Sequence, residues 1–127
     1  MKISKSIKYL AFSIVMLIIT GCATQPQPLY AYGDYSDSYY SYKKHATPES
    51  LLELQKSMES AIENSSNSRS GRVPPGMYAN LGYLYLKAGK PNDAISNFTK
   101  EKTIYPESAL FMNRVINKIQ VTEGNVK

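Results

Sequence analysis

The chain has 127 residues, enough for one small domain with flanking segments. It carries 15 lysine and arginine residues against 10 acidic ones, a formal net charge of +5. Three of the lysines lie in the first eight residues, so the remainder has 12 basic and 10 acidic groups, a net of +2. Because that excess is too weak to predict an anionic partner, we expect no nucleic-acid binding.

The N-terminal segment has the organisation of a secretory signal. The three early lysines precede an apolar run from Tyr9 to Ile19, and small residues follow it. The run is about half of the roughly 20 residues that a transmembrane helix needs. We therefore predict a signal peptide over 1–21 that is removed, not a permanent membrane span.

The end of this segment, Ile19-Thr20-Gly21-Cys22, resembles the lipobox of bacterial lipoproteins. The resemblance implies that the Cys22 thiol receives a diacylglyceryl group and that cleavage leaves Cys22 as an acylated N-terminus, labelled by palmitate. The alternative is an ordinary thiol in a plain secretory segment. Ala23 follows, which implies the outer membrane, on its periplasmic face, in a Gram-negative source. The chain has no second cysteine for an intramolecular disulfide.

Residues 22–46 are predicted to form a lipidated, tyrosine-rich neck. Its first part is rich in Thr, Gln and Pro, which favours an extended, mobile tether. Four tyrosines then recur at helical spacing and define one face: Tyr32, Tyr35, Tyr39 and Tyr42. This face has three interpretations: it packs on the domain, it contacts a partner or the membrane interface, or the segment is disordered.

Residues 47–122 are predicted to form an all-α domain of about four helices, with a tail at 123–127. Thr47-Pro48-Glu49 is a strong helix start, and the helix ends near Asn64. A Ser/Asn/Gly-rich loop follows to Gly76. Three further helices are expected at 77–87, 92–104 and 106 to about 121. In the last one, the predicted core face is Phe111, Val115 and Ile119, broadened by Leu110, Met112 and Ile116.

Residues 75–108 resemble one tetratricopeptide repeat, a 34-residue helix–turn–helix unit. Gly82 and Ala94 are small where two helices cross, and Gly89 suits a left-handed helix end. Glu101 departs from the pattern, which suggests looser packing or an end-of-array position. The residues that carry the resemblance are Tyr78, Leu81, Gly82, Tyr85, Ala94, Phe98 and Pro106.

The repeat resemblance also implies a partner-binding face on the first helix of the unit. On the matched register this face holds Ala79, Tyr83, Leu86 and Lys87, with Asn80 beside them. Asn80 and Lys87 would hold a peptide backbone or carboxylate above the Tyr83 ring. The alternative is that all five are ordinary surface and core-edge residues.

The order of lipobox, Tyr/Gly motif, helix and repeat resembles a family of small proteobacterial outer-membrane lipoproteins known only as a domain of unknown function. The segment Leu29–Tyr35 and the repeat carry this resemblance. Such proteins are often encoded beside a lipoprotein related to the curli secretion channel. The resemblance therefore implies an envelope assembly or secretion complex, with that lipoprotein as a candidate partner.

No motif for chemistry is present in the sequence. His45 is the single histidine and precedes a helix cap, and no recognisable metal, phosphate-loop or nucleophile motif occurs. We expect no enzyme activity, cofactor, metal or small-molecule substrate. The leading hypothesis is a membrane-anchored scaffold or accessory subunit. The alternatives are a pilotin-like chaperone for an outer-membrane subunit, or a lipoprotein that senses a ligand or stress.

Overall fold

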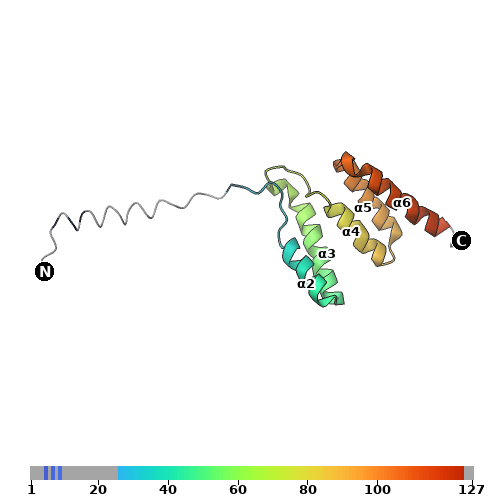
Figure 1. The fold of residues 1–127 in the computed structure, drawn as a ribbon, viewed down its shortest axis with the longest axis horizontal. Helices are drawn as coiled ribbons and strands as arrows, with labels where there is room; N and C mark the ends of the chain where they lie inside the picture. The colour runs from blue at the N-terminus through green and yellow to red at the C-terminus, as the bar shows by residue number, and fades with distance from the viewer. Residues whose placement is uncertain (1–4, 6, 8, 10–25, 125–127) are drawn as a thin grey trace.

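The computed structural model describes residues 5, 7, 9 and 26–124. Within 26–124 every regular element is helical, so the predicted all-α class is confirmed. The short 3₁₀ turns η2 (Ser65–Asn67) and η3 (Pro106–Ser108) follow the helices at Pro48–Glu63 and Pro91–Ile104. Figure 1 labels the α-helices of this part of the chain, which are α2 (Tyr35–His45), α3 (Pro48–Glu63), α4 (Met77–Lys87), α5 (Pro91–Ile104) and α6 (Ala109–Gly124).

The start of α3 is fixed by a reciprocal cap. The Thr47 side chain accepts a hydrogen bond from the Ser50 backbone N–H at 3.2 Å, and the Ser50 hydroxyl accepts one from the Thr47 N–H at 3.0 Å. Pro48 occupies the first helical position, where it costs no hydrogen bond. The predicted helix start at Thr47 is confirmed, and its partner is Ser50.

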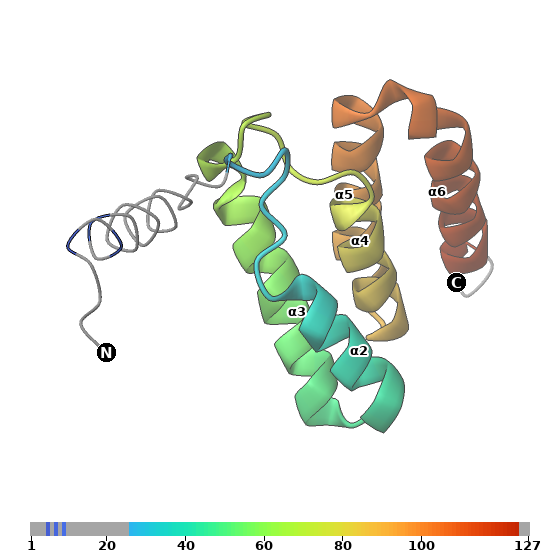
Figure 2. The same ribbon diagram turned by 60° about the vertical axis from the view of Figure 1, so that its left-hand side comes forward.

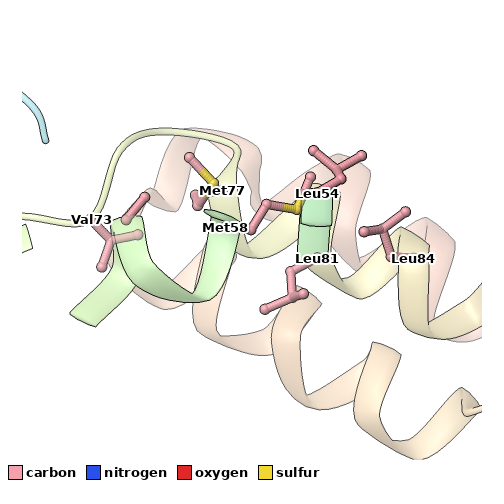
Figure 3. Packing of buried hydrophobic residues seen from close by; sticks show 7 residues of the cluster. Leu54, Met58, Val73, Met77, Leu81 and Leu84 are labelled. Atoms are coloured by element: carbon pink, nitrogen blue, oxygen red, sulfur yellow. The ribbon is translucent and has the colours of Figure 1, made fainter. Parts of the chain in front are cut away.

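The helices pack mainly on their neighbours in the sequence. The α2–α3 pair lies beside the α4–α5 pair, and α6 packs on α5 (Figure 2). One buried cluster joins α3, the following loop and α4 (Figure 3): Leu54, Met58, Ala61, Val73, Met77, Leu81 and Leu84. A second joins α5 and α6: Ala94, Phe98, Met112, Ile116 and Ile119. Tyr85 packs against both clusters and so connects the two halves of the domain.

The close crossing of α4 and α5 depends on Gly82. A Cβ atom placed on Gly82 would lie 3.0 Å from the Phe98 ring and 3.1 Å from the carbonyl oxygen of Ala94. Gly89 ends α4 with a φ of +72°, in the left-handed region that glycine adopts without strain. Both glycines therefore have the roles that the sequence predicts for them.

The tyrosine-rich segment folds onto the domain. Tyr35 and Tyr42 of α2 pack against the first cluster, and Ala46 ends the helix with a φ of +49° before Thr47 starts α3. Of the three interpretations of this segment, packing on the domain is the one that the structure supports. Helix α2 lies within the residues assigned to the neck, so residues 26–124 hold five helices, and four of these begin within the predicted domain at 47–122.

A short segment without regular secondary structure, Gln27–Tyr30, lies against the loop between α3 and α4; we call it the strap. The backbone carbonyls of Pro28 and Leu29 accept hydrogen bonds from the N–H groups of Arg69 and Ser70 at 3.0 and 3.1 Å. The Gln27 amide donates to the Asn67 carbonyl at 3.1 Å. The strap is therefore fastened to the loop before α2 begins.

The face that α6 buries is narrower than the predicted one. Met112 and Ile116 are buried with Ile119, whereas Phe111 and Leu110 are 64% and 67% exposed. The buried set and the predicted set of Phe111, Val115 and Ile119 both repeat at helical spacing, so periodicity alone does not choose between them. The choice is made by α5, whose Phe98 and Ala94 face the first set. The helix also runs to Gly124, into the residues assigned to the C-terminal tail.

Glu101 is not a site of looser packing, which corrects the interpretation of this departure from the repeat pattern. Its side chain is 3% exposed. One carboxylate oxygen accepts a hydrogen bond from the Gly76 N–H at 2.7 Å, and the other accepts one from the Ala79 N–H at 3.3 Å. Because the first N–H groups of a helix lack partners within it, Glu101 of α5 caps the start of α4.

Candidate functional site

Two grooves flank the exposed face of α4, one against each neighbouring helix. Helix α2 and the floor residues of α3 border the first, and α6 borders the second. Tyr83 of α4 lines both grooves and is 54% exposed. Because the two grooves share Tyr83, we treat them as one candidate site, which we call the α4 face.

The groove between α2 and α4 has a volume of about 260 Å³. Leu54, Met58 and Leu84 of the first cluster lie at its floor. Its walls carry aromatic, amide and ammonium groups: Tyr39, Tyr42, Lys43, Asn80, Tyr83 and Lys87. This combination suits a chain that offers both apolar area and hydrogen-bond acceptors.

The groove between α4 and α6 is larger, about 460 Å³, and its lining is mostly apolar. Leu86, Val115 and Ile119 supply aliphatic surface between the rings of Tyr83 and Phe111. Lys118, Thr122 and Glu123 provide a polar edge. An apolar floor with aromatic walls and a polar edge resembles the centre and rim of a protein interface.

Sequence reasoning missed the α6 wall of this site. Phe111 and Val115 were predicted to lie in the core, but Phe111 stands in the groove. A signal was present, because α6 has more apolar residues than one buried stripe accommodates. The surplus stripe is what faces the groove.

The predicted residues of α4 are partly brought together. Tyr83 and Lys87 both line the first groove, and the Lys87 ammonium lies 5.3 Å from the centre of the Tyr83 ring. Leu86 lies in the second groove. Ala79 instead packs against the second cluster, as a core-edge residue. Asn80 donates a hydrogen bond from its side chain to the Tyr35 hydroxyl at 3.1 Å, so it joins α4 to α2.

The four tyrosines of α2 and its approach divide into two groups. Tyr35 and Tyr42 pack on the core, and burial raises the pKa of Tyr35 above its ordinary value. Tyr32 and Tyr39 are 41% and 43% exposed. The rings of Tyr32, Tyr35 and Tyr39 follow one another at centroid separations of 6.3 and 5.9 Å. Tyr39 and Tyr42 line the groove between α2 and α4, so they belong to the α4 face. Tyr32 and Tyr35 do not line it.

The remaining sequence predictions concern the membrane and metals. Cys22 lies outside the described residues. Among the residues that are described, no helix is both long and apolar enough to span a bilayer. In the same part of the chain, no group of three or more His, Cys, Asp or Glu side chains is placed to hold a metal ion. His45 is exposed at the end of α2.

A family model described as a domain of unknown function (DUF4810) matches residues 29–115. The match begins in the strap, covers α2 to α5 and ends within α6. No curated protein and no solved structure matches the chain.

Proposed function

This chain belongs to the DUF4810 family, a domain of unknown function, and we propose that it is a lipid-anchored interaction subunit of the bacterial envelope. Its α4 face receives an extended or helical segment of another envelope protein. The proposal assigns binding, not catalysis, to the site. The single observation that carries it is that the two grooves share the exposed Tyr83 side chain.

The chemistry of the face supports a protein partner over a small molecule. The two grooves share Tyr83, and together their linings draw on four helices, α2, α3, α4 and α6. Small-molecule sites more often enclose most of their ligand. The exposed aromatic groups and the polar edge instead match the residue types that dominate protein interfaces.

The anchor and the repeat are further parts of the proposal. Cys22 resembles the acylated residue of a lipobox, and the order α4–turn–α5 with Gly82 at the crossing resembles a tetratricopeptide unit. The α2–α3 hairpin adds a second pair of helices beside it, in the manner of a stacked repeat. We place the protein at the periplasmic face of an outer membrane, in an assembly or secretion complex. A lipoprotein related to the curli secretion channel is the candidate partner that the family resemblance suggests.

The binding proposal is tested by affinity purification from detergent-solubilised envelopes at native expression levels. We expect a defined partner to co-purify with the wild type and with Leu110→Ala, and to be lost with Phe111→Ser and Tyr83→Ser. Leu110 is the matched control because it is 67% exposed, is adjacent to Phe111 and does not line the groove. Recovery of the wild type as a lone monomer would contradict the proposal.

A deletion strain separates the scaffold role from a pilotin-like role. If the protein is a scaffold, its deletion leaves the partner in the outer membrane but unassembled. If the protein is a chaperone for localisation, its deletion leaves the partner in the wrong membrane, which fractionation of the deletion strain detects. The anchor has an independent test, because Cys22→Ser should abolish labelling with palmitate.

A further inference from the structure

The strap fixes where the lipid tether leaves the folded domain. It holds the chain at Gln27 through the Asn67 carbonyl, and at Pro28 and Leu29 through the backbone of the loop at 69–70. The next residue, Tyr30, lies close enough to Tyr105 to contribute to the raised pKa of its hydroxyl, and Tyr105 is 5% exposed just after α5. The folded domain therefore begins at the strap and not at α2.

This attachment leaves little slack between the lipid and the domain. Five peptide units join Cys22 to Gln27. Fully extended, they reach about 17 Å. Without the strap, the first fastened residue would be Tyr35, and the same estimate would give a reach of about 45 Å. The strap thus shortens the tether to roughly the length of α4, which is about 16 Å.

The surface next to the strap suits lipid headgroups. From Asn64 to Gly76 the loop is rich in Ser and Asn, and it has two arginines and no acidic residue. Arg69 is exposed, and Arg72 stacks on the Tyr105 ring at 4.7 Å from its centre. Leu29 of the strap is 50% exposed. A loop of polar groups without an acidic residue can lie against a phosphate-bearing surface without charge repulsion and without insertion into hydrocarbon.

We infer that the end of the domain formed by the strap and the α3–α4 loop faces the lipid headgroups, and that the strap is the device that holds it there. This inference rests on the proposed acylation of Cys22. It identifies the phospholipid surface as the partner of the loop end. The turn between α4 and α5 then points away from the membrane, because α4 begins at the loop and ends at Lys87.

The orientation determines how a protein partner reaches the α4 face. Because α4 runs away from the bilayer, the grooves on either side of it open parallel to the membrane. A partner segment therefore approaches from the side and not from above. Two proteins of one envelope complex, both held at the same leaflet, would meet in this arrangement.

The test uses the full acylated protein in vesicles of phosphatidylethanolamine and phosphatidylglycerol. Because Cys22 is the only cysteine and its thiol is acylated, a single introduced cysteine accepts a fluorescent label selectively. Three variants each introduce one cysteine at an exposed position: Ser66→Cys in the loop, Ala88→Cys after α4, and Tyr40→Cys on α2. Nitroxide-headgroup lipid is the quencher.

We expect quenching to be several-fold stronger at residue 66 than at residues 88 and 40. Equal quenching at all three, or the strongest quenching at residue 88 or 40, would overturn the inference. Strongest quenching at residue 40 would place the tyrosine-rich α2 on the membrane. If the protein does not float with the vesicles at all, the anchoring proposal itself fails, so the two failures are distinguishable.

A lengthened tether tests the role of the strap. An insert of about ten Gly and Ser residues between Thr24 and Gln25 behaves as a flexible coil. It should reduce the preference for residue 66 while flotation persists. The same insert after Lys127 is the matched control and should leave the preference intact. A preference that survives the N-terminal insert unchanged would show that the short tether does not set the orientation.

Discussion

At the scale of single residues, Glu101 and Tyr105 show how polar groups are satisfied where the C-terminal end of α5 contacts the loop before α4. Glu101 accepts backbone N–H groups at the start of α4. The Tyr105 hydroxyl donates to the Val73 carbonyl at 2.5 Å. Both side chains are buried, so the loss of either set of hydrogen bonds leaves unpaired polar groups in the interior.

Glu101→Gln is expected to lower the free energy of unfolding by about 1–3 kcal/mol, because one charged acceptor is lost at a helix start. Urea denaturation followed by helical circular dichroism measures the change. Glu107→Gln is the matched control at an exposed position and should change stability by less than about 0.5 kcal/mol. Equal effects of the two substitutions would contradict the capping role.

The raised pKa of Tyr105 predicts a loss of folding stability at alkaline pH. Burial, with a smaller contribution from the hydrogen bond with Tyr30, raises the pKa of Tyr105 from 10.0 to about 12. Because the folded state holds the proton more tightly, this contribution is complete below pH 10 and is lost as the pH rises towards 12. Tyr105→Phe should flatten the fall in the urea midpoint between these pH values.

The measurement compares urea midpoints at several pH values for the wild type, Tyr105→Phe and Tyr40→Phe. Tyr40 is 69% exposed, so its replacement should leave the alkaline fall unchanged. Burial also raises the pKa of Tyr35, Tyr78 and Tyr85, and these groups remain in both variants. An alkaline fall that is identical in all three proteins would exclude Tyr105 as a source of it.

At the scale of elements, the crossing of α4 and α5 is the contact that the sequence specifies most directly. Gly82→Ala should destabilise the domain by about 1–2 kcal/mol net, since overpacking outweighs the gain in helix propensity. The Ala94 carbonyl belongs to the backbone and cannot move aside as a flexible side chain would. Thermal and urea unfolding measure the loss.

Gly124→Ala is the control for this change, because Gly124 is also helical and nothing lies within 4 Å of its added Cβ atom. It should be neutral or slightly stabilising. If the two glycine substitutions behave alike, the packing account of Gly82 is wrong. Phe98→Leu combined with Gly82→Ala should recover part of the loss, because the ring is one of the two contacts.

At the scale of the whole molecule, the helices form a short stack in which each contacts mainly its sequence neighbours. In such a stack the inner units are held on both sides and the outer ones on one side. Hydrogen exchange measured by mass spectrometry should therefore be slowest in α4 and α5, and faster in α2 and the second half of α6. Uniform protection across all five helices would indicate a single cooperative unit instead.

Much of the fold follows from local signals in the sequence. The predicted helix at 77–87 is confirmed residue for residue, because Gly76 and Gly89 sit at its two ends. The helix after Thr47 and the helix after Lys90 begin at prolines for the same local reason. Caps and breakers act within one turn, so a single sequence determines them.

The candidate site was predicted less completely. Tyr83, Leu86 and Lys87 were identified from the register of the repeat, and they line the grooves. The opposite wall, with Phe111, was assigned to the core. Its placement depends on which stripe of α6 meets Phe98, which is a contact between elements.

The sequence by itself determined the class of the fold, the ends of most helices, the close crossing at Gly82 and the resemblance of Cys22 to a lipid-attachment residue. The tertiary structure decided which face of α6 is buried, that α2 packs on the core, and that Glu101 caps α4. The reason is physical. Helix ends and glycine conformations depend on neighbouring residues, whereas burial and the pairing of polar groups depend on residues that are distant in the chain and close in space.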